Sequence, residues 1–128
     1  MAGDNYKGGF RDLEVWKEAR QFRMDVSILV KRFPDHEKYR LTNQLIRASR
    51  SITANLAEGY GRFHFQENIQ YCRQSRGSLM ECLDHISCAM DEEFIRQEDF
   101  SKFEIRYDKI LKMLNGYIKY LKNQKENA

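Results

Sequence analysis

Six polar residues fall into two short series that have the spacing of a helix face. They are Ser51, Asn55, Glu58, Ser75, Ser78 and Glu81. Residues three or four apart lie on one side of an α-helix, so two such sides could meet. Their contact would form either a hydrogen-bonded layer that fixes helix register or the wall of a ligand pocket. Both interpretations stay open, and we favour the layer.

Arginines form a second set with helical spacing, interspersed with asparagine and glutamine. They are Arg40, Arg47, Arg50, Arg62, Arg73 and Arg76. If their two segments are neighbouring antiparallel helices, the side chains form adjacent stripes. Guanidinium groups bind phosphate through paired hydrogen bonds, which suits RNA. A solvated charged face, or pairing with Glu58, Glu67 or another subunit, explains the pattern equally well.

No spacing singles out a metal site or a catalytic nucleophile. The nearest metal-like series is Cys82, His85 and Cys88. Two steps of three residues turn a helix by about 600°, so Cys88 points away from Cys82. Serine, cysteine and threonine lack the spacing that would identify a base and its orienting partner. We therefore expect no metal, no cofactor and no catalytic residue.

Gly59, Tyr60 and Gly61 stand between two segments with helical periodicity. This run follows a helical segment, and it lacks the third glycine and the lysine of phosphate-binding loops. We therefore interpret the glycines as a helix terminator and a site of close approach between backbones. Tyr60, with Phe63 and His64, could also stack on an unpaired base.

Four helices would position all of these residues. Apolar side chains recur every three or four positions, and the chain contains one proline, Pro34. We expect helices over residues 12–33, 35–58, 63–90 and about 100–121, with Tyr39 among the inward residues of the second. Short connections make consecutive helices antiparallel. The sequence therefore predicts an all-α, antiparallel up-down-up-down four-helix bundle.

The length of 128 residues predicts one domain. We expect a flexible lead-in at residues 1–10, the bundle at 11–122 and a frayed tail at 123–128. The net charge of +3 does not distinguish a nucleic-acid-binding protein from other soluble proteins. The charge is unevenly distributed, because residues 31–76 contain nine basic and four acidic side chains. The three cysteines share one expected helix at spacings too long for a disulfide, and no apolar run could span a membrane. These features indicate a soluble cytoplasmic protein without membrane contact.

The segment NLAEGYGR at 55–62 carries a family resemblance, together with Trp16, RASRS at 47–51 and SRGSLME at 75–81. It resembles the four-helix-bundle proteins encoded in intervening sequences of bacterial 23S ribosomal RNA genes. The resemblance covers about residues 10–122 and supplies no catalytic residue. It implies a homo-oligomer, a ring of five subunits, and an association with RNA. From the residues themselves, we expect Trp16, Tyr71, Phe94 and Tyr120 to be more aromatic surface than one small core can bury, which also favours association.

Three hypotheses about function follow, in order of preference. The first is a non-enzymatic bundle that binds RNA or a ribonucleoprotein through the six arginines. The second is a protein adaptor, similar to the pentameric accessory factors of diversity-generating retroelements that assist a reverse transcriptase. The third is an enzyme around Asn55, Glu58 and Glu81, which requires a pocket there with a carboxylate of raised pKa. A purely structural role is a further alternative.

Overall fold

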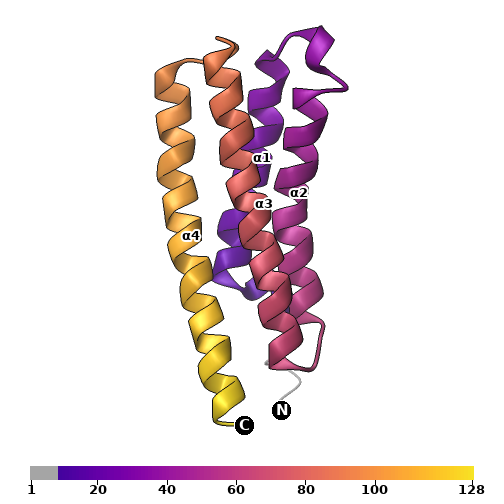
Figure 1. Ribbon diagram of the computed structural model, residues 1–128, viewed down its shortest axis with the longest axis vertical. Helices are drawn as coiled ribbons and strands as arrows, with labels where there is room; N and C mark the ends of the chain where they lie inside the picture. The colour runs from indigo at the N-terminus through magenta and orange to yellow at the C-terminus, as the bar shows by residue number, and fades with distance from the viewer. Residues whose placement is uncertain (1–8) are drawn as a thin grey trace.

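Four long helices stand side by side and form a bundle (Figure 1). The computed structural model describes residues 9–128, and within this range the chain has no β-strand. The helices are α1 (Glu14–Leu29), α2 (Leu41–Tyr60), α3 (Phe65–Asp91) and α4 (Gln97–Glu126). The chain runs up, down, up and down, so the start of α1 and the end of α4 lie at the same end of the bundle. The predicted antiparallel four-helix bundle is confirmed.

Helix α1 forms where apolar residues recur at helical spacing, and it buries Trp16, Phe22 and Val26. Two short 3-10 helices flank it, η2 (Gly9–Asp12) and η3 (Val30–Arg32). Phe33 then adopts an extended backbone, with φ −75° and ψ 148°, as the residue before a proline must. Residues 1–8 of the expected lead-in lie outside the described residues, but Phe10 packs edge-on against Trp16 at 5.3 Å between ring centroids.

The predicted start of the second helix near Asp35 is wrong. Residues Asp35–Glu37 form a separate 3-10 helix, η4, and α2 begins only at Leu41. The backbone N–H of Leu41 donates to Oε1 of Glu37 at 3.2 Å, which satisfies one of the donors at the helix start. Tyr39 precedes the helix and is 82% exposed, so its expected burial is also wrong.

Helix α2 continues through Gly59 and ends at Tyr60, with Gly61 as the capping residue. The prediction that glycine terminates the helix is therefore confirmed for Gly61 and wrong for Gly59. The expected close approach is present, because a Cβ added at Gly59 would lie 2.6 Å from Oδ1 of Asn68 and 2.9 Å from Cβ of Tyr71. Glycine at this position lets the start of α3 pack directly against the end of α2.

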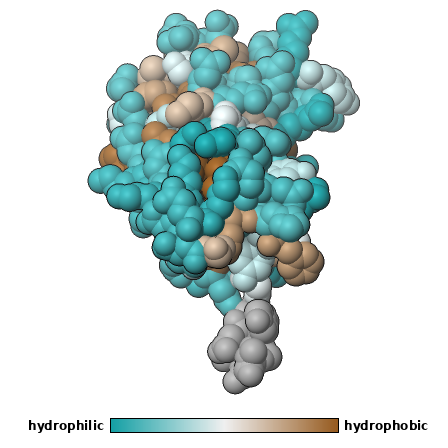
Figure 2. Space-filling model, turned by 60° about the horizontal axis from the view of Figure 1, so that its bottom comes forward, coloured by the Kyte–Doolittle hydropathy of each residue, from teal (hydrophilic) through white to brown (hydrophobic). Residues whose placement is uncertain are grey.

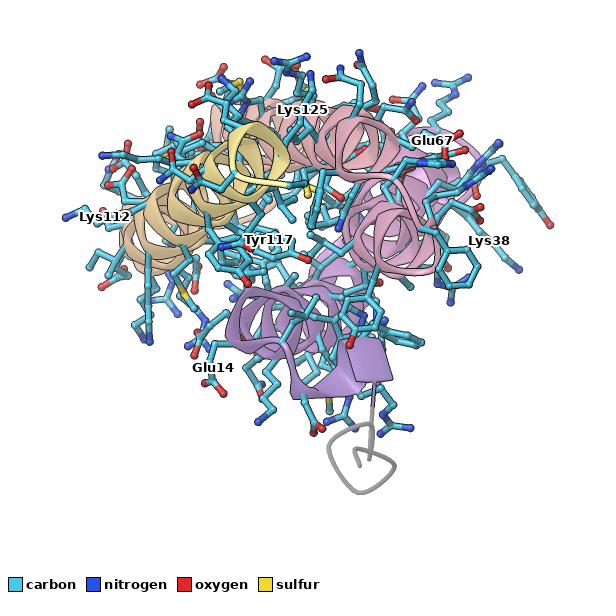
Figure 3. All side chains as sticks on the ribbon, turned by 90° about the horizontal axis from the view of Figure 1, so that it is seen from below. Glu14, Lys38, Glu67, Lys112, Tyr117 and Lys125 are labelled. Atoms are coloured by element: carbon cyan, nitrogen blue, oxygen red, sulfur yellow. The ribbon has the colours of Figure 1, made fainter. Side chains whose placement is uncertain are left out.

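Helix α4 is longer than the sequence predicts. It buries Phe103, Ile110, Leu114, Ile118 and Leu121, and it continues to Glu126 through most of the tail expected to fray. Seen from the end of the bundle, Tyr117 points toward its middle, where its hydroxyl accepts a hydrogen bond from Nδ2 of Asn68 at 3.3 Å (Figure 3).

The surface shown in Figure 2 is mainly hydrophilic, with small apolar patches between the polar side chains. Within residues 9–128, no helix is long and apolar enough to cross a membrane.

Candidate functional site

Three of the six polar residues meet between α2 and α3. Nδ2 of Asn55 donates to the backbone oxygen of Ser51 at 2.9 Å and to its hydroxyl at 3.0 Å. The Ser78 hydroxyl donates across the helix pair to Oγ of Ser51 at 3.0 Å. Ser75 adds a second link, because its buried hydroxyl donates to the Ile52 carbonyl at 2.8 Å. These bonds hold α2 and α3 in one register.

The two carboxylates of this set lie outside the polar layer. Glu58 pairs with Arg62 at 2.9 Å, and Glu81 lies 3.1 Å from Nε2 of His85. Arg62 follows Glu58 by four residues, just after the end of α2, and His85 follows Glu81 by four residues within α3. Both carboxylates face solvent. The expectation that all six residues share one layer is therefore wrong for Glu58 and Glu81, because long side chains reach local partners without being desolvated.

The six arginines differ in their contacts. Within residues 9–128, the ion pairs of arginine involve Arg32, Arg62, Arg96 and Arg106. Arg62 also donates to the hydroxyl of Tyr71 at 2.9 Å and lies over its ring. Arg76 donates to Oδ1 of Asn115 at 2.7 Å. The other four are exposed and have no ion pair in this part of the chain; they are Arg40, Arg47, Arg50 and Arg73.

The arginines do not form two simple adjacent stripes. Arg76 extends from α3 toward Asn115 of α4, whereas Arg50 of α2 lines the groove between α1 and α2. The basic residues therefore continue from the side of α2 that faces α1, over the α2 and α3 pair, to the side of α3 that faces α4. Sequence spacing placed Arg47, Arg50, Arg73 and Arg76 on the correct helices. It was wrong for Arg40, which precedes α2, and for Arg62, which lies in the connection between α2 and α3.

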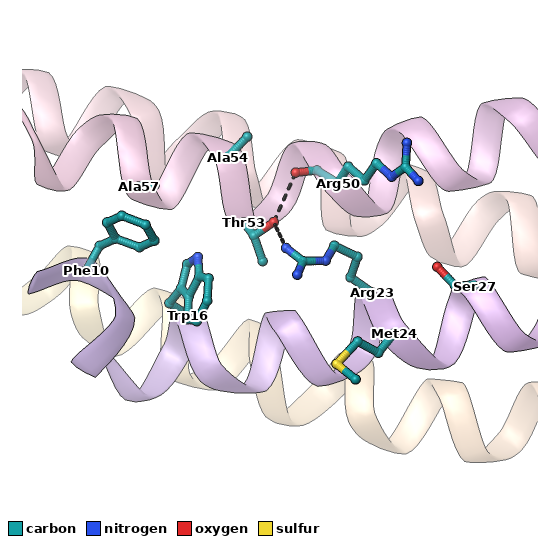
Figure 4. A pocket seen from close by; sticks show the side chains of 9 residues that line it. All are labelled: Phe10, Trp16, Arg23, Met24, Ser27, Arg50, Thr53, Ala54 and Ala57. Atoms are coloured by element: carbon teal, nitrogen blue, oxygen red, sulfur yellow. Dashed lines mark hydrogen bonds between the residues drawn. The ribbon is translucent and has the colours of Figure 1, made fainter. Parts of the chain in front are cut away.

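A groove between α1 and α2 has a volume of about 570 Å³ (Figure 4). We call it the α1–α2 groove; its lining is Phe10, Trp16, Arg23, Met24, Ser27, Arg50, Thr53, Ala54 and Ala57. Nη1 of Arg23 donates to Oγ1 of Thr53 at 2.8 Å, and that hydroxyl donates to the Arg50 carbonyl at 3.1 Å. Sequence analysis missed this arrangement, because no motif links Arg23 with Thr53.

The opposite side of α1 is electrostatically different. There Asp25 pairs with Arg106 at 3.4 Å and Glu18 pairs with Lys109 at 3.2 Å, both across to α4. Arg32 makes two hydrogen bonds to Asp99, at 2.9 and 3.0 Å. These bonds, with the Arg96 backbone N–H, lower the pKa of Asp99 to about 2. The contact of α1 with α4 is thus neutralised by ion pairs.

The model of a family described as "23S rRNA-intervening sequence protein" matches residues 11–116, which include every arginine and polar residue considered above. The chain belongs to this family. A solved structure from Bacteroides thetaiotaomicron, described as a protein of unknown function from the S23 ribosomal protein family, has the same fold with a TM-score of 0.75. It is 21% identical, and the match covers 82% of this chain and 98% of that one. No curated protein matches the chain.

The description of the 23S rRNA-intervening sequence protein family names no catalytic activity. In this member, burial raises the pKa of Cys72 and that of Cys82 to about 12, so both thiols stay protonated at neutral pH. Within the described residues, no three His, Cys, Asp or Glu side chains are grouped as a metal site requires. The α1–α2 groove contains none of the six polar residues, including those of the enzyme hypothesis.

Proposed function

We propose that this family member binds RNA, alone or within a ribonucleoprotein, through arginines of α2 and α3 and without a catalytic step. The observation that carries the proposal is the exposure of Arg40, Arg47, Arg50 and Arg73, none of which has an ion pair within residues 9–128. Such guanidinium groups can bind phosphate without first breaking a bond to a carboxylate. The family description supports the proposal by linking these proteins with ribosomal RNA.

Aromatic side chains at the α2–α3 junction add a second type of RNA contact. Phe63 is 98% exposed and Tyr60 is 40% exposed, and His64 is exposed beside them. Exposed aromatic rings can stack on bases that are not paired. We therefore favour structured RNA with single-stranded loops over a regular duplex.

A charge-reversal experiment tests this proposal. One variant changes Arg47, Arg50 and Arg73 to Glu, and a matched variant changes Lys112, Lys119 and Lys122 of α4 to Glu. All six side chains are exposed, and the two variants have the same net charge. The affinity of each for a structured ribosomal RNA fragment is measured by fluorescence anisotropy, and circular dichroism confirms that both fold.

The proposal predicts that the arginine variant loses at least about tenfold in affinity while the lysine variant loses much less, because only the arginines contact phosphate. Equal losses would contradict the proposed surface. Weak binding by the wild type at low salt would contradict RNA binding itself and favour a protein partner such as a reverse transcriptase.

We also propose that copies of the chain associate with one another, and that the protein is cytoplasmic. Ile28 of α1 and Ile105 of α4 are 63% and 69% exposed and line an open groove of about 510 Å³. Of the aromatic residues expected to exceed the core, Tyr120 is 54% exposed and supports association. Trp16 is buried and Tyr71 and Phe94 are half-buried, so they support it less. All three cysteines are free thiols, which suits a reducing compartment. Light scattering of the purified protein over a range of concentrations tests the association.

A further inference from the structure

Two arginines, Arg23 and Arg50, line the α1–α2 groove. Among residues 9–128, no acidic residue lines it. On the other side of α1, by contrast, Asp25 and Glu18 pair with basic residues of α4. An anionic group that enters the α1–α2 groove would therefore meet positive charge that the lining does not neutralise.

Thr53 orients one of these guanidinium groups in advance. The threonine is 4% exposed, and its hydroxyl accepts a hydrogen bond from Nη1 of Arg23 at 2.8 Å while it donates to the Arg50 carbonyl at 3.1 Å (Figure 4). A guanidinium has five N–H donors, so this bond leaves others available to an anion. Because the partner is a neutral hydroxyl, the charge of Arg23 is retained. The side chain is held in place without being neutralised.

The remainder of the groove offers an apolar wall and a further donor. Phe10, Ala54 and Ala57 supply apolar surface. Figure 4 shows the indole nitrogen of Trp16 on the edge that faces α2, where it forms no hydrogen bond with the other residues drawn. The volume of about 570 Å³ lies within the range of small-molecule sites. Positive charge beside an apolar wall with an N–H donor suits a phosphate joined to a base.

We propose that the α1–α2 groove binds one nucleotide, with its phosphate at Arg23 and Arg50 and its base against the apolar wall beside Trp16. The choice of a nucleotide rests on the proposed function, since Arg50 belongs both to the exposed arginines and to this groove. A free nucleotide and an unpaired nucleotide of bound RNA present the same groups to the site.

The fluorescence of Trp16 tests the proposal directly, because it is the single tryptophan of the chain. The full chain is titrated with adenosine 5′-monophosphate, uridine 5′-monophosphate, adenosine and inorganic phosphate. We expect a saturable change with the nucleotides, and at least about tenfold weaker responses to adenosine and to phosphate, which each lack one half of the ligand.

Variants then assign the response to the groove. Arg50→Gln and Thr53→Val should each weaken nucleotide binding by about tenfold, since one removes a charged donor and the other releases Arg23. Thr53→Ser keeps the hydroxyl and should keep most of the affinity. Lys112→Gln, an exposed change on α4, should have no effect. Arg50 is exposed, so its variant should fold even if the substitution of the buried Thr53 does not.

The outcomes separate this site from the proposed function. If a single-stranded oligonucleotide binds at least about tenfold more tightly than the mononucleotides, the groove holds a nucleotide of RNA; equal affinity indicates a free nucleotide. Nucleotide binding without binding of structured RNA would contradict the proposed function alone. No saturable response, or a response unchanged in Arg50→Gln and Thr53→Val, would overturn the nucleotide site even if structured RNA binds.

Discussion

Asp99 connects the start of α4 with Arg32 through one carboxylate. Its Oδ2 accepts the backbone N–H of Arg96 at 2.9 Å, which caps the start of α4. Both carboxylate oxygens also accept hydrogen bonds from Arg32, which follows α1 in the chain. The helix cap and the two hydrogen bonds from Arg32 both stabilise the charged form of the carboxylate, so both lower the pKa of Asp99. This residue is therefore the clearest link between pH and the stability of the bundle.

We predict that Asp99→Asn lowers stability at neutral pH and that the loss diminishes in acid. The pKa of Asp99 is about 2 in the folded chain, below the value of about 3.9 expected in the unfolded chain. Its stabilising effect is therefore complete above about pH 4 and is lost as the pH falls toward 2. Urea unfolding at pH 7 should show a loss of up to about 1 kcal/mol, because the pair is partly exposed.

The same unfolding measurements repeated between pH 5 and pH 2.5 provide the check, with Glu98→Gln as a control that removes a neighbouring exposed carboxylate. The difference between wild type and Asp99→Asn should narrow in this range. A difference that stays constant with pH would show that the charge of Asp99 contributes nothing.

At the scale of single residues, the sequence identified polar side chains better than it identified their partners. Helical spacing placed Ser51, Asn55 and Ser78 together correctly. Their side chains are short, so each can form hydrogen bonds only with groups directly beside it on the two helices. It failed for Glu58, whose longer side chain reaches Arg62 in solvent. The Arg23 contact with Thr53 joins residues 30 apart on different helices, so no local pattern reports it.

At the scale of elements, the absence of a side chain at Gly59 allows the close approach of α2 and α3. Gly59 is buried, and an added Cβ would overlap Asn68 Oδ1 and lie 3.1 Å from the Asn68 backbone oxygen. By contrast, a Cβ added at Gly77 or Gly116 meets nothing within 4 Å. The same substitution therefore has opposite consequences at different glycines.

We predict that Gly59→Ala destabilises the protein by about 1–3 kcal/mol, since backbone or side chains must move apart to admit the methyl group. Gly77→Ala is the matched change on α3, and it should stabilise by up to about 1 kcal/mol because alanine favours the helix. Urea unfolding of both variants measures the two effects. If Gly59→Ala were as stable as Gly77→Ala, the helices could not approach as closely as described.

Element boundaries show what periodicity can predict and what it cannot. The repeats of apolar residues predicted four helices and their order, because each helix must bury one face. They could not predict that residues 35–40 stay outside α2, since this depends on the 3-10 helix after Pro34. Nor could they predict that α4 reaches Glu126, where Lys125 donates to Gln66 of α3 across 59 residues of sequence.

At the scale of the whole molecule, the distribution of charge matters more than its total of +3. Ion pairs neutralise the side of α1 that contacts α4. Exposed arginines without ion pairs lie instead on α2 and α3, and Arg23 of α1 lines the α1–α2 groove together with Arg50, one of these exposed arginines. The sequence predicted that Arg47 and Arg50 lie on one helix and Arg73 and Arg76 on the next, but only the packing of the helices shows which arginines lack an acidic partner.

The salt dependence of RNA affinity is the decisive measurement for the proposed arginine surface, because its slope counts the phosphate contacts. The association constant for a structured ribosomal RNA fragment is measured at several salt concentrations for the wild type and for a variant with Arg47, Arg50 and Arg73 changed to Gln. A control changes Lys112, Lys119 and Lys122 to Gln.

If the arginines bind phosphate, the slope of log Kobs against log salt concentration will be shallower by about 2 in the arginine variant, because three phosphate contacts are lost. The lysine control should keep the slope of the wild type. Identical slopes for all three proteins would contradict the claim that the exposed arginines of α2 and α3 form an RNA surface.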